Sequence, residues 1–369
     1  MPKATEPVVL VASAEFALKS SPVRRTLEQR LIDDLKFALR RGDLECSRVE
    51  KDAARLVVFG TKRANAAAEL CSKIFGVAYA APAQLLSNPA LEDITETVAE
   101  LAQERLSKGA SFAVRAHRST PGIIPRRDVE VQGGSRVLRT MKERGVKVNL
   151  DYPDVTFYVD LIGSDAYVYS ERLTGPGGLP LSSQWKMLAL LDLGPLSILA
   201  AFAMMRRGCV VELLVPTSDT IARLSSSTQL ALAEKVGRLV TRPNYKAFTF
   251  EIDEQLGGRL TEHANWRKVI RTMAVKFAVE ERFRGVIFGD TSGDLSSLGG
   301  RYFTSSQMPI FYPLLGLEQE ELAELSSLVG IKQSELLLYS GLDWSDKSET
   351  QPESNFSDSL IPSVREVHF

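Results

Sequence analysis

The sequence predicts a multidomain chain of mixed α/β and α+β class that ends in a doubly wound parallel sheet. Its length of 369 residues exceeds that of one ordinary domain. Strands and helices alternate through the first 77 residues, which is typical of a ferredoxin-like sandwich. After residue 180, short apolar strands are separated by long helices, which indicates a parallel sheet covered by helices.

The first predicted domain covers residues 1–77. Its clearest element is a helix at 24–42, because Leu27, Leu31 and Leu35 recur at spacings of four and a glycine ends the pattern. The other predicted elements are strands at 8–12 and 55–60 and a helix at 62–76.

The second predicted domain covers residues 78–173. In the segment 111–118, Phe112, Val114 and Ala116 alternate with polar neighbours, which predicts a half-buried strand. An amphipathic helix is expected at 91–109, and a hairpin at 154–173 whose strands alternate with a period of two.

The third predicted domain covers residues 174–342 and begins with a glycine- and proline-rich linker at 174–180. We expect strands at 187–191, 210–216, 246–252 and 285–290, with helices at 197–207, 228–241, 265–282 and 318–329. Residues 343–369 are rich in Ser, Asp and Glu and predict a disordered acidic tail.

Composition indicates a cytoplasmic protein with two halves of opposite charge. Three isolated cysteines without a CxxC pair are typical of a reducing compartment, and no apolar run reaches the ~18 residues that would span a membrane. Residues 1–147 hold 25 Lys and Arg against 18 Asp and Glu, whereas the remainder holds 20 against 28. Such a division suggests a basic part that meets an anionic partner, although chance segregation over a large surface would also produce it.

The basic charge is densest between residues 105 and 147. Eleven Lys and Arg face three acids there, a density that suits binding of RNA or another polyanion. The alternative is an ordinary solvated helix face with its loops. Because aromatic residues do not interleave the basic ones, we expect recognition by backbone and shape rather than by base stacking.

The turn at 192–197 has the outline of a phosphate-binding loop, since it joins a strand to a helix. Its residues argue against that use. Asp192 would repel a polyphosphate, Leu193 and Leu196 are bulky, and Pro195 lacks an N–H donor. Gly194 and Ser197 alone suit an anion, so an ordinary connection is the favoured reading of this turn.

A second loop, at 285–303, follows an apolar strand and is rich in glycine and serine, so it could line a pocket or merely cover the surface. The three histidines, His117, His263 and His368, are far apart in the sequence and indicate neither a triad nor a metal site. We therefore predict no catalytic residue and no metal ligand.

Several motifs in order resemble the ThiI family of THUMP-domain, ATP-dependent tRNA sulfurtransferases. The similar stretches are EFALKSSPVR, FAVRAHR followed by DVEVQGG, NLDYPDVTFYVDL (the family pattern is L.NPDV), GPGGLP, AAFAMMRRGC and IFYPLLGLEQEELAELSSLVG. The resemblance runs from about residue 8 to residue 341. It implies an N-terminal ferredoxin-like domain, a THUMP domain and a PP-loop ATPase-like domain of the adenine nucleotide alpha hydrolase type.

The chain departs from the family pattern where the family's chemistry resides. The family loop SGGxDS corresponds here to residues 192–197, so the diglycine and the aspartate are missing. Two glutamines are absent from GDTSGDLSSLGG, and Ser340 stands where the family has a sulfur-carrying cysteine. A serine hydroxyl cannot carry a persulfide.

The resemblance implies a tRNA-binding THUMP protein that has lost or reduced adenylation and sulfur transfer. An active sulfurtransferase with a rebuilt ATP site and an external sulfur carrier is one alternative, and an assembly protein without an RNA role is another.

The expected partner is the acceptor end of tRNA, with a homodimer or partner subunit as a further possibility, and ATP with Mg²⁺ is the implied cofactor. The residues expected to bind RNA are Arg115, Arg118, Arg126, Arg127, Arg136, Arg139 and Lys147. The vestigial nucleotide-binding positions are Gly194, Ser197, Gly289, Asp290 and Gly293.

Overall fold

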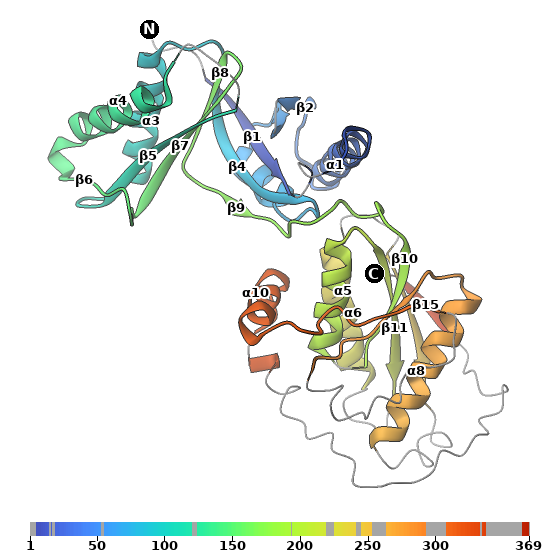
Figure 1. Cartoon of the computed structure of the whole chain (residues 1–369). Coiled ribbons are helices and arrows are strands. Elements are labelled where there is room, and N and C mark those ends of the chain that lie inside the picture. Colours follow the sequence, from blue (N-terminus) through green and yellow to red (C-terminus); the bar gives the residue numbers. More distant parts are fainter. Residues whose placement is uncertain are drawn as a thin grey trace. The chain divides into compact units, whose positions relative to one another are not determined.

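The structure is a computed structural model, and it divides the chain into two compact units (Figure 1). It describes residues 5–368 except 15, 17, 18, 53, 54, 120–123, 193, 219–224, 241–244, 253–262, 293–307, 333 and 337–363. The first unit covers Met1–Gly178 and the second Leu179–Phe369, so the division falls within the predicted linker at 174–180.

The first part of unit 1 has the predicted ferredoxin-like elements. They are β1 (Glu6–Ser13), α1 (Ser21–Arg41), β2 (Arg48–Asp52), β3 (Arg55–Phe59), α2 (Ala64–Cys71) and β4 (Val77–Leu86). The buried face of α1 carries Leu27, Leu31 and Leu35, which confirms the predicted periodicity. Strands β2 and β4 were not predicted, and β4 pairs with β1 along its length.

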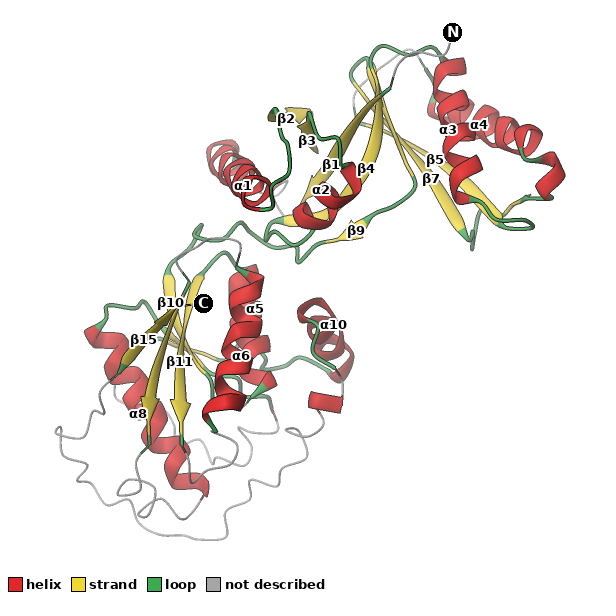
Figure 2. Ribbon diagram, turned by 180° about the vertical axis from the view of Figure 1, so that it is seen from behind, coloured by secondary structure: helices red, strands yellow, loops and turns green. Residues whose placement is uncertain are grey.

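The second part of unit 1 contains the predicted helix, strand and hairpin. Its elements are α3 (Leu91–Arg105), β5 (Ser111–Arg118), α4 (Arg126–Thr140), η2 (Lys142–Arg144), β6 (Lys147–Val148), β7 (Val155–Ile162), β8 (Asp165–Tyr169) and β9 (Leu173–Thr174). Helices α3 and α4 cover β5 and β7 (Figure 2). Among the described residues, one nine-stranded sheet of order β2-β3-β1-β4-β8-β7-β5-β6, with β9 beside β4, joins both parts. The predicted boundary at residue 77 therefore falls at the start of a strand that both parts share.

The face of this sheet opposite the helices buries apolar residues from β1, β3 and β4 together with Tyr167 and Tyr169 of β8. At its margin the Arg172 guanidinium lies 3.7 Å from the ring centroid of Tyr158 and 4.7 Å from that of Tyr79. Cation–π contacts of this kind contribute about 0.5–2 kcal/mol each. Arg172 thus connects Tyr79 of β4, in the first part of unit 1, with Tyr158 of β7, in the second part, and stabilises the two parts against each other.

Unit 2 is a parallel sheet with helices on both faces, as predicted. Its elements are β10 (Lys186–Leu190), α5 (Pro195–Arg206), β11 (Val210–Thr217), α6 (Ser226–Leu239), β12 (Lys246–Glu251), α8 (His263–Glu280), β13 (Val286–Ile287), β14 (Ile310–Phe311), α10 (Gln319–Val329) and β15 (Arg365–His368). In the described part, the strand order is β14-β13-β10-β11-β12-β15. Helices α5 and α6 lie on one face and α8 on the other (Figure 1).

The prediction of a disordered tail is wrong for the last described residues. Strand β15 pairs with β12 in antiparallel register, and Lys246 forms an ion pair with Glu366 at 2.8 Å. Val364 packs against the apolar cluster beneath α8. Sheet-edge hydrogen bonds stabilise a segment whose own sequence carries little apolar periodicity. Among the described residues, we find no helix with the length and apolar character needed to cross a membrane.

Candidate functional site

The carboxyl ends of β10 and β13 form the place where a doubly wound sheet binds its ligand. Strand β10 continues through α5 to β11, whereas β13 lies on its other side and is reached through α8. The strand order reverses between β10 and β13, and ligands bind outside such a reversal. Asp192 follows β10, and Asp290 follows β13.

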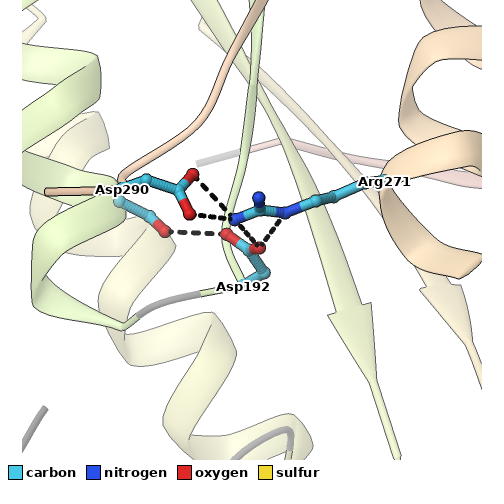
Figure 3. A network of polar contacts seen from close by, with 4 residues as sticks. Asp192, Arg271 and Asp290 are labelled. Atoms are coloured by element: carbon cyan, nitrogen blue, oxygen red, sulfur yellow. Dashed lines mark hydrogen bonds and ion pairs between the residues drawn. The ribbon is translucent and has the colours of Figure 1, made fainter. Parts of the chain in front are cut away.

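A buried ion network occupies this position (Figure 3). Arg271 of α8 donates from Nε to Asp192 at 2.9 Å and from a terminal nitrogen to both oxygens of Asp290, at 2.8 and 3.0 Å. That terminal nitrogen also lies 2.9 Å from Asp192. Ser197 donates a longer hydrogen bond, of 3.4 Å, to the other oxygen of Asp192. One guanidinium is thus shared by two carboxylates from two strand ends.

The network is withdrawn from solvent. Asp290 is 0% exposed, Arg271 4% and Asp192 6%. Burial by itself lowers the pKa of Arg271, but the two carboxylates more than offset this and raise the pKa above the usual arginine value. The guanidinium also lies over the ring of Phe288, at 4.6 Å from its centroid. Arg271 is therefore a permanent cation at this site.

The first turn of α5 packs tightly against the end of β13. A Cβ placed on Gly289 would lie 2.7 Å from the Ser197 nitrogen and 2.9 Å from the Leu196 carbonyl carbon, so this position requires glycine. Gly194 has φ of 55°, the left-handed region that favours glycine. Pro195, Leu196 and Ser197 are all buried. The start of the helix faces protein rather than an open phosphate site.

These residues do not fit a nucleotide polyphosphate. A phosphate at the start of α5 would need open backbone N–H groups, yet Pro195 has none and the Ser197 amide lies against Gly289. The predicted repulsion by Asp192 needs correction, because Arg271 pairs with this carboxylate. Of the expected vestigial positions, Gly289 lies against Ser197, Ser197 and Asp290 belong to the ion network, and Gly194 precedes α5. Gly293 and Leu193 lie outside the described residues.

Sequence reasoning missed Arg271, which is the centre of the network. Its signal was one charged residue within the mostly apolar segment 269–275 (VIRTMAV) of the predicted helix 265–282. Such a residue is rarely buried without a partner. The partners are 79 and 19 residues away in the sequence, so spacing could not identify them.

The predicted RNA-binding residues of unit 1 divide into two groups. Arg118 donates to the carbonyl of Ile124, and Arg136 forms an ion pair with Glu96, so both have partners within the protein. The exposed group comprises Arg115, Arg126, Arg127, Arg139 and Lys147, of which Arg115 also donates to the Leu150 carbonyl. Arg126 and Arg127 form the first turn of α4, where backbone N–H groups also favour an anion.

The thiols are unsuited to nucleophilic chemistry. Burial raises the pKa of Cys71 to about 12 and also raises the pKa values of Cys46 and Cys209. Ser340 lies outside the described residues. Within the described part of the chain, no group of His, Cys, Asp and Glu could hold a metal ion.

Three segments of the chain match known protein families. Residues 8–81 match the ThiI ferredoxin-like domain, residues 89–171 match the THUMP domain, and residues 182–337 match the thiamine biosynthesis protein ThiI. These segments follow the architecture in order, since the first two lie in unit 1 and the third lies in unit 2.

Several tRNA sulfurtransferases are similar over most of the chain. A probable tRNA sulfurtransferase from Aeropyrum pernix is 31% identical over 88% of this chain and 83% of its own length. Another probable tRNA sulfurtransferase, from Caldanaerobacter subterraneus, is 30% identical over 88% of this chain and 85% of its own length. A tRNA sulfurtransferase from Pyrobaculum aerophilum is 28% identical, and the chain spans 66% of its length.

Two solved structures share the fold. A protein from Pyrococcus horikoshii has a TM-score of 0.66 at 23% identity, covering 88% of this chain and all of its own. A 4-thiouridine synthetase in complex with RNA and ATP also has a TM-score of 0.66, at 20% identity over 88% of this chain and 85% of its own.

Proposed function

The chain belongs to the family of tRNA sulfurtransferases, and on that premise we propose that it binds tRNA through unit 1 without adenylating it in unit 2. The observation that carries this proposal is the buried network of Asp192, Arg271 and Asp290 at the place where an ATP-using relative would hold its nucleotide.

The RNA half of the proposal is supported by exposed positive charge. Arg126 and Arg127 lie at the start of α4, and Arg139 lies in its last turn. Arg115 and Lys147 add exposed charge on β5 and β6. Each arginine can bind a phosphate in bidentate fashion, and salt-dependent affinity follows from their number.

Two independent differences from the family support the second part of the proposal, that unit 2 does not adenylate tRNA. The crevice at β10 and β13 already holds its own cation and two anions, so a triphosphate would have to separate a buried ion network. The sulfur-carrying cysteine of the family corresponds to Ser340, and the three thiols of the chain have raised pKa values.

The second candidate is an active sulfurtransferase with a rebuilt site, and Arg271 is the observation that favours it. A guanidinium at the strand reversal could bind phosphate oxygens if it exchanged Asp290 for the ligand. An external carrier would then supply sulfur. This alternative requires ATP binding, which the first proposal forbids.

Calorimetry with ATP and Mg²⁺, with and without tRNA, separates these candidates. We expect no heat from ATP and clear, salt-sensitive binding of a tRNA transcript. ATP binding of micromolar affinity would favour the rebuilt site, and formation of 4-thiouridine in the tRNA product would establish it. A chain that binds neither ligand would refute both.

A pair of charge reversals tests the RNA surface. Arg126→Glu with Arg127→Glu is expected to weaken tRNA binding and to reduce the salt slope by about one for each lost phosphate contact. The matched control is Arg207→Glu with Arg238→Glu, two exposed arginines of unit 2. Equal effects of both pairs would show that net charge alone, and not the THUMP surface, governs binding.

A further inference from the structure

A short turn between β6 and β7 presents an unusually exposed aromatic ring. Tyr152 is 87% exposed, and the neighbouring Leu150 is 64% exposed. Large apolar side chains presented in this way often mark contact sites.

Hydrogen bonds fix the backbone of the turn that carries the ring. The Asn149 amide donates to the Tyr152 carbonyl at 2.8 Å, and its oxygen accepts from the Asp151 and Tyr152 nitrogens at 3.1 Å. The Asp154 carboxylate accepts from the Ser111 hydroxyl at 2.6 Å and from the Ser111 nitrogen at 2.7 Å. These two bonds lower the pKa of Asp154 and tie the turn to β5. A ring on a stiff turn loses little conformational freedom on binding.

Two cations accompany the turn, which itself carries the exposed carboxylates Asp151 and Asp154. Arg115 donates to the Leu150 carbonyl at 2.6 Å, so its exposed guanidinium lies against the turn itself. Lys147 pairs with Ser111, and because side chains alternate along a strand, Lys147 projects on the same face of the sheet as Arg115. The turn thus presents one exposed aromatic ring together with two exposed cations on one face of the sheet.

We propose that Tyr152 stacks on an unpaired nucleobase of the bound RNA while Arg115 and Lys147 hold the adjoining phosphates. The inference rests on the proposed tRNA binding and adds to it the class of group recognised. Every base offers a π-face to an aromatic ring, and a charged groove that follows the backbone beside such rings is how single strands are held. The proposal also replaces the expectation from the sequence that RNA is recognised without base stacking. That expectation rested on the absence of aromatic residues interleaved with the basic ones, and a single tyrosine outside the basic segment does not form such a motif.

Nucleic acid is favoured over a protein partner because of the charge around the ring. The centre of a protein interface is depleted in charged residues, whereas this turn carries the exposed Asp151 beside the ring and is contacted by Arg115. Leu150 would then cover the edge of the stacked base. A protein contact remains a distinguishable outcome of the experiment.

The experiment measures the affinity of the full chain for a tRNA transcript across a series of salt concentrations. Stacking on an aromatic ring is worth about 1–3 kcal/mol per base, so Tyr152→Ala is expected to weaken binding by about 5- to 150-fold at every salt concentration, with an unchanged slope. Tyr152→Phe keeps the ring and is expected to stay close to the parent. Lys147→Ala, in contrast, is expected to reduce the slope by about one.

The control is Trp185→Ala, which removes an exposed aromatic ring (65% exposed) from unit 2 and is expected to leave RNA affinity unchanged. Parental circular dichroism of Tyr152→Ala confirms its fold. If the parent binds tRNA and Tyr152→Ala binds equally well, stacking is refuted while the proposed function stands. If Tyr152→Ala instead changes only the sedimentation of the chain, Tyr152 belongs to a protein contact and stacking is again refuted. A parent that fails to bind tRNA overturns both proposals.

Discussion

Replacing Arg271 by leucine is expected to destabilise unit 2 by about 3–5 kcal/mol, because it leaves buried carboxylates without their counter-charge. Both carboxylates lie within 3.0 Å of a guanidinium nitrogen, and both are almost fully buried. The 3.4 Å hydrogen bond from Ser197 offers Asp192 weak compensation. The expected loss is thus a large fraction of the stability of an ordinary domain.

Urea unfolding followed by tryptophan fluorescence measures this loss. All three tryptophans, Trp185, Trp266 and Trp344, belong to unit 2, so the signal reports on that unit even if unit 1 unfolds separately. Arg284→Leu removes an exposed arginine that follows α8 and is the matched control, with an expected change within about 0.5 kcal/mol.

A loss below about 1 kcal/mol at neutral pH would refute this reasoning, because it would mean that the carboxylates are solvated in solution. Restored stability in the triple variant with Asp192→Asn and Asp290→Asn would assign the cost to their charge.

Three further predictions concern packing, the sheet edge and the thiols. Gly289→Ala is expected to cost about 1–3 kcal/mol in urea unfolding, because its Cβ would overlap the backbone of Ser197; a parental midpoint would contradict the close contact. Removing residues 364–369 uncovers the edge of β12 and is expected to promote self-association, which sedimentation detects; an unchanged monomer fraction would argue against β15 as an edge cover. Alkylation of the native chain at mildly alkaline pH should modify the half-buried Cys46 faster than the two buried cysteines, which mass spectrometry resolves; faster reaction of Cys71 would contradict its raised pKa.

Periodicity predicted the elements that bury one regular face. The strand at 111–118 alternates except at the buried Ala113, and α1 repeats leucine every fourth residue, so local pattern was sufficient for both. Strand β4 escaped prediction because its sequence, VAYAAPAQLL, is rich in alanine and contains a proline, and it forms because β1 and β8 pair on either side. Strand β15 depends in the same way on β12.

The sequence indicated which strand ends meet at the candidate site, but it did not reveal the charges that pair there. Gly194, Ser197, Gly289 and Asp290 follow two parallel strands, and such strand ends meet at one edge of a sheet. The sign of the electrostatics at Asp192 could not be inferred, because it depends on a guanidinium contributed by α8 from a distant part of the sequence. Charge pairing across a core is a tertiary property, and no periodicity encodes it.

The buried network also bears on why the fold of unit 2 can persist without a nucleotide. A crevice that must bind a polyanion needs uncompensated positive potential, which destabilises the empty protein until the ligand arrives. Here Asp192 and Asp290 supply the negative charge permanently, and Gly289 allows α5 to close on β13. The same residues that exclude a phosphate therefore complete the core. The proposed function assigns RNA binding to unit 1 and places the satisfied ion network in unit 2, so the two units can be tested independently.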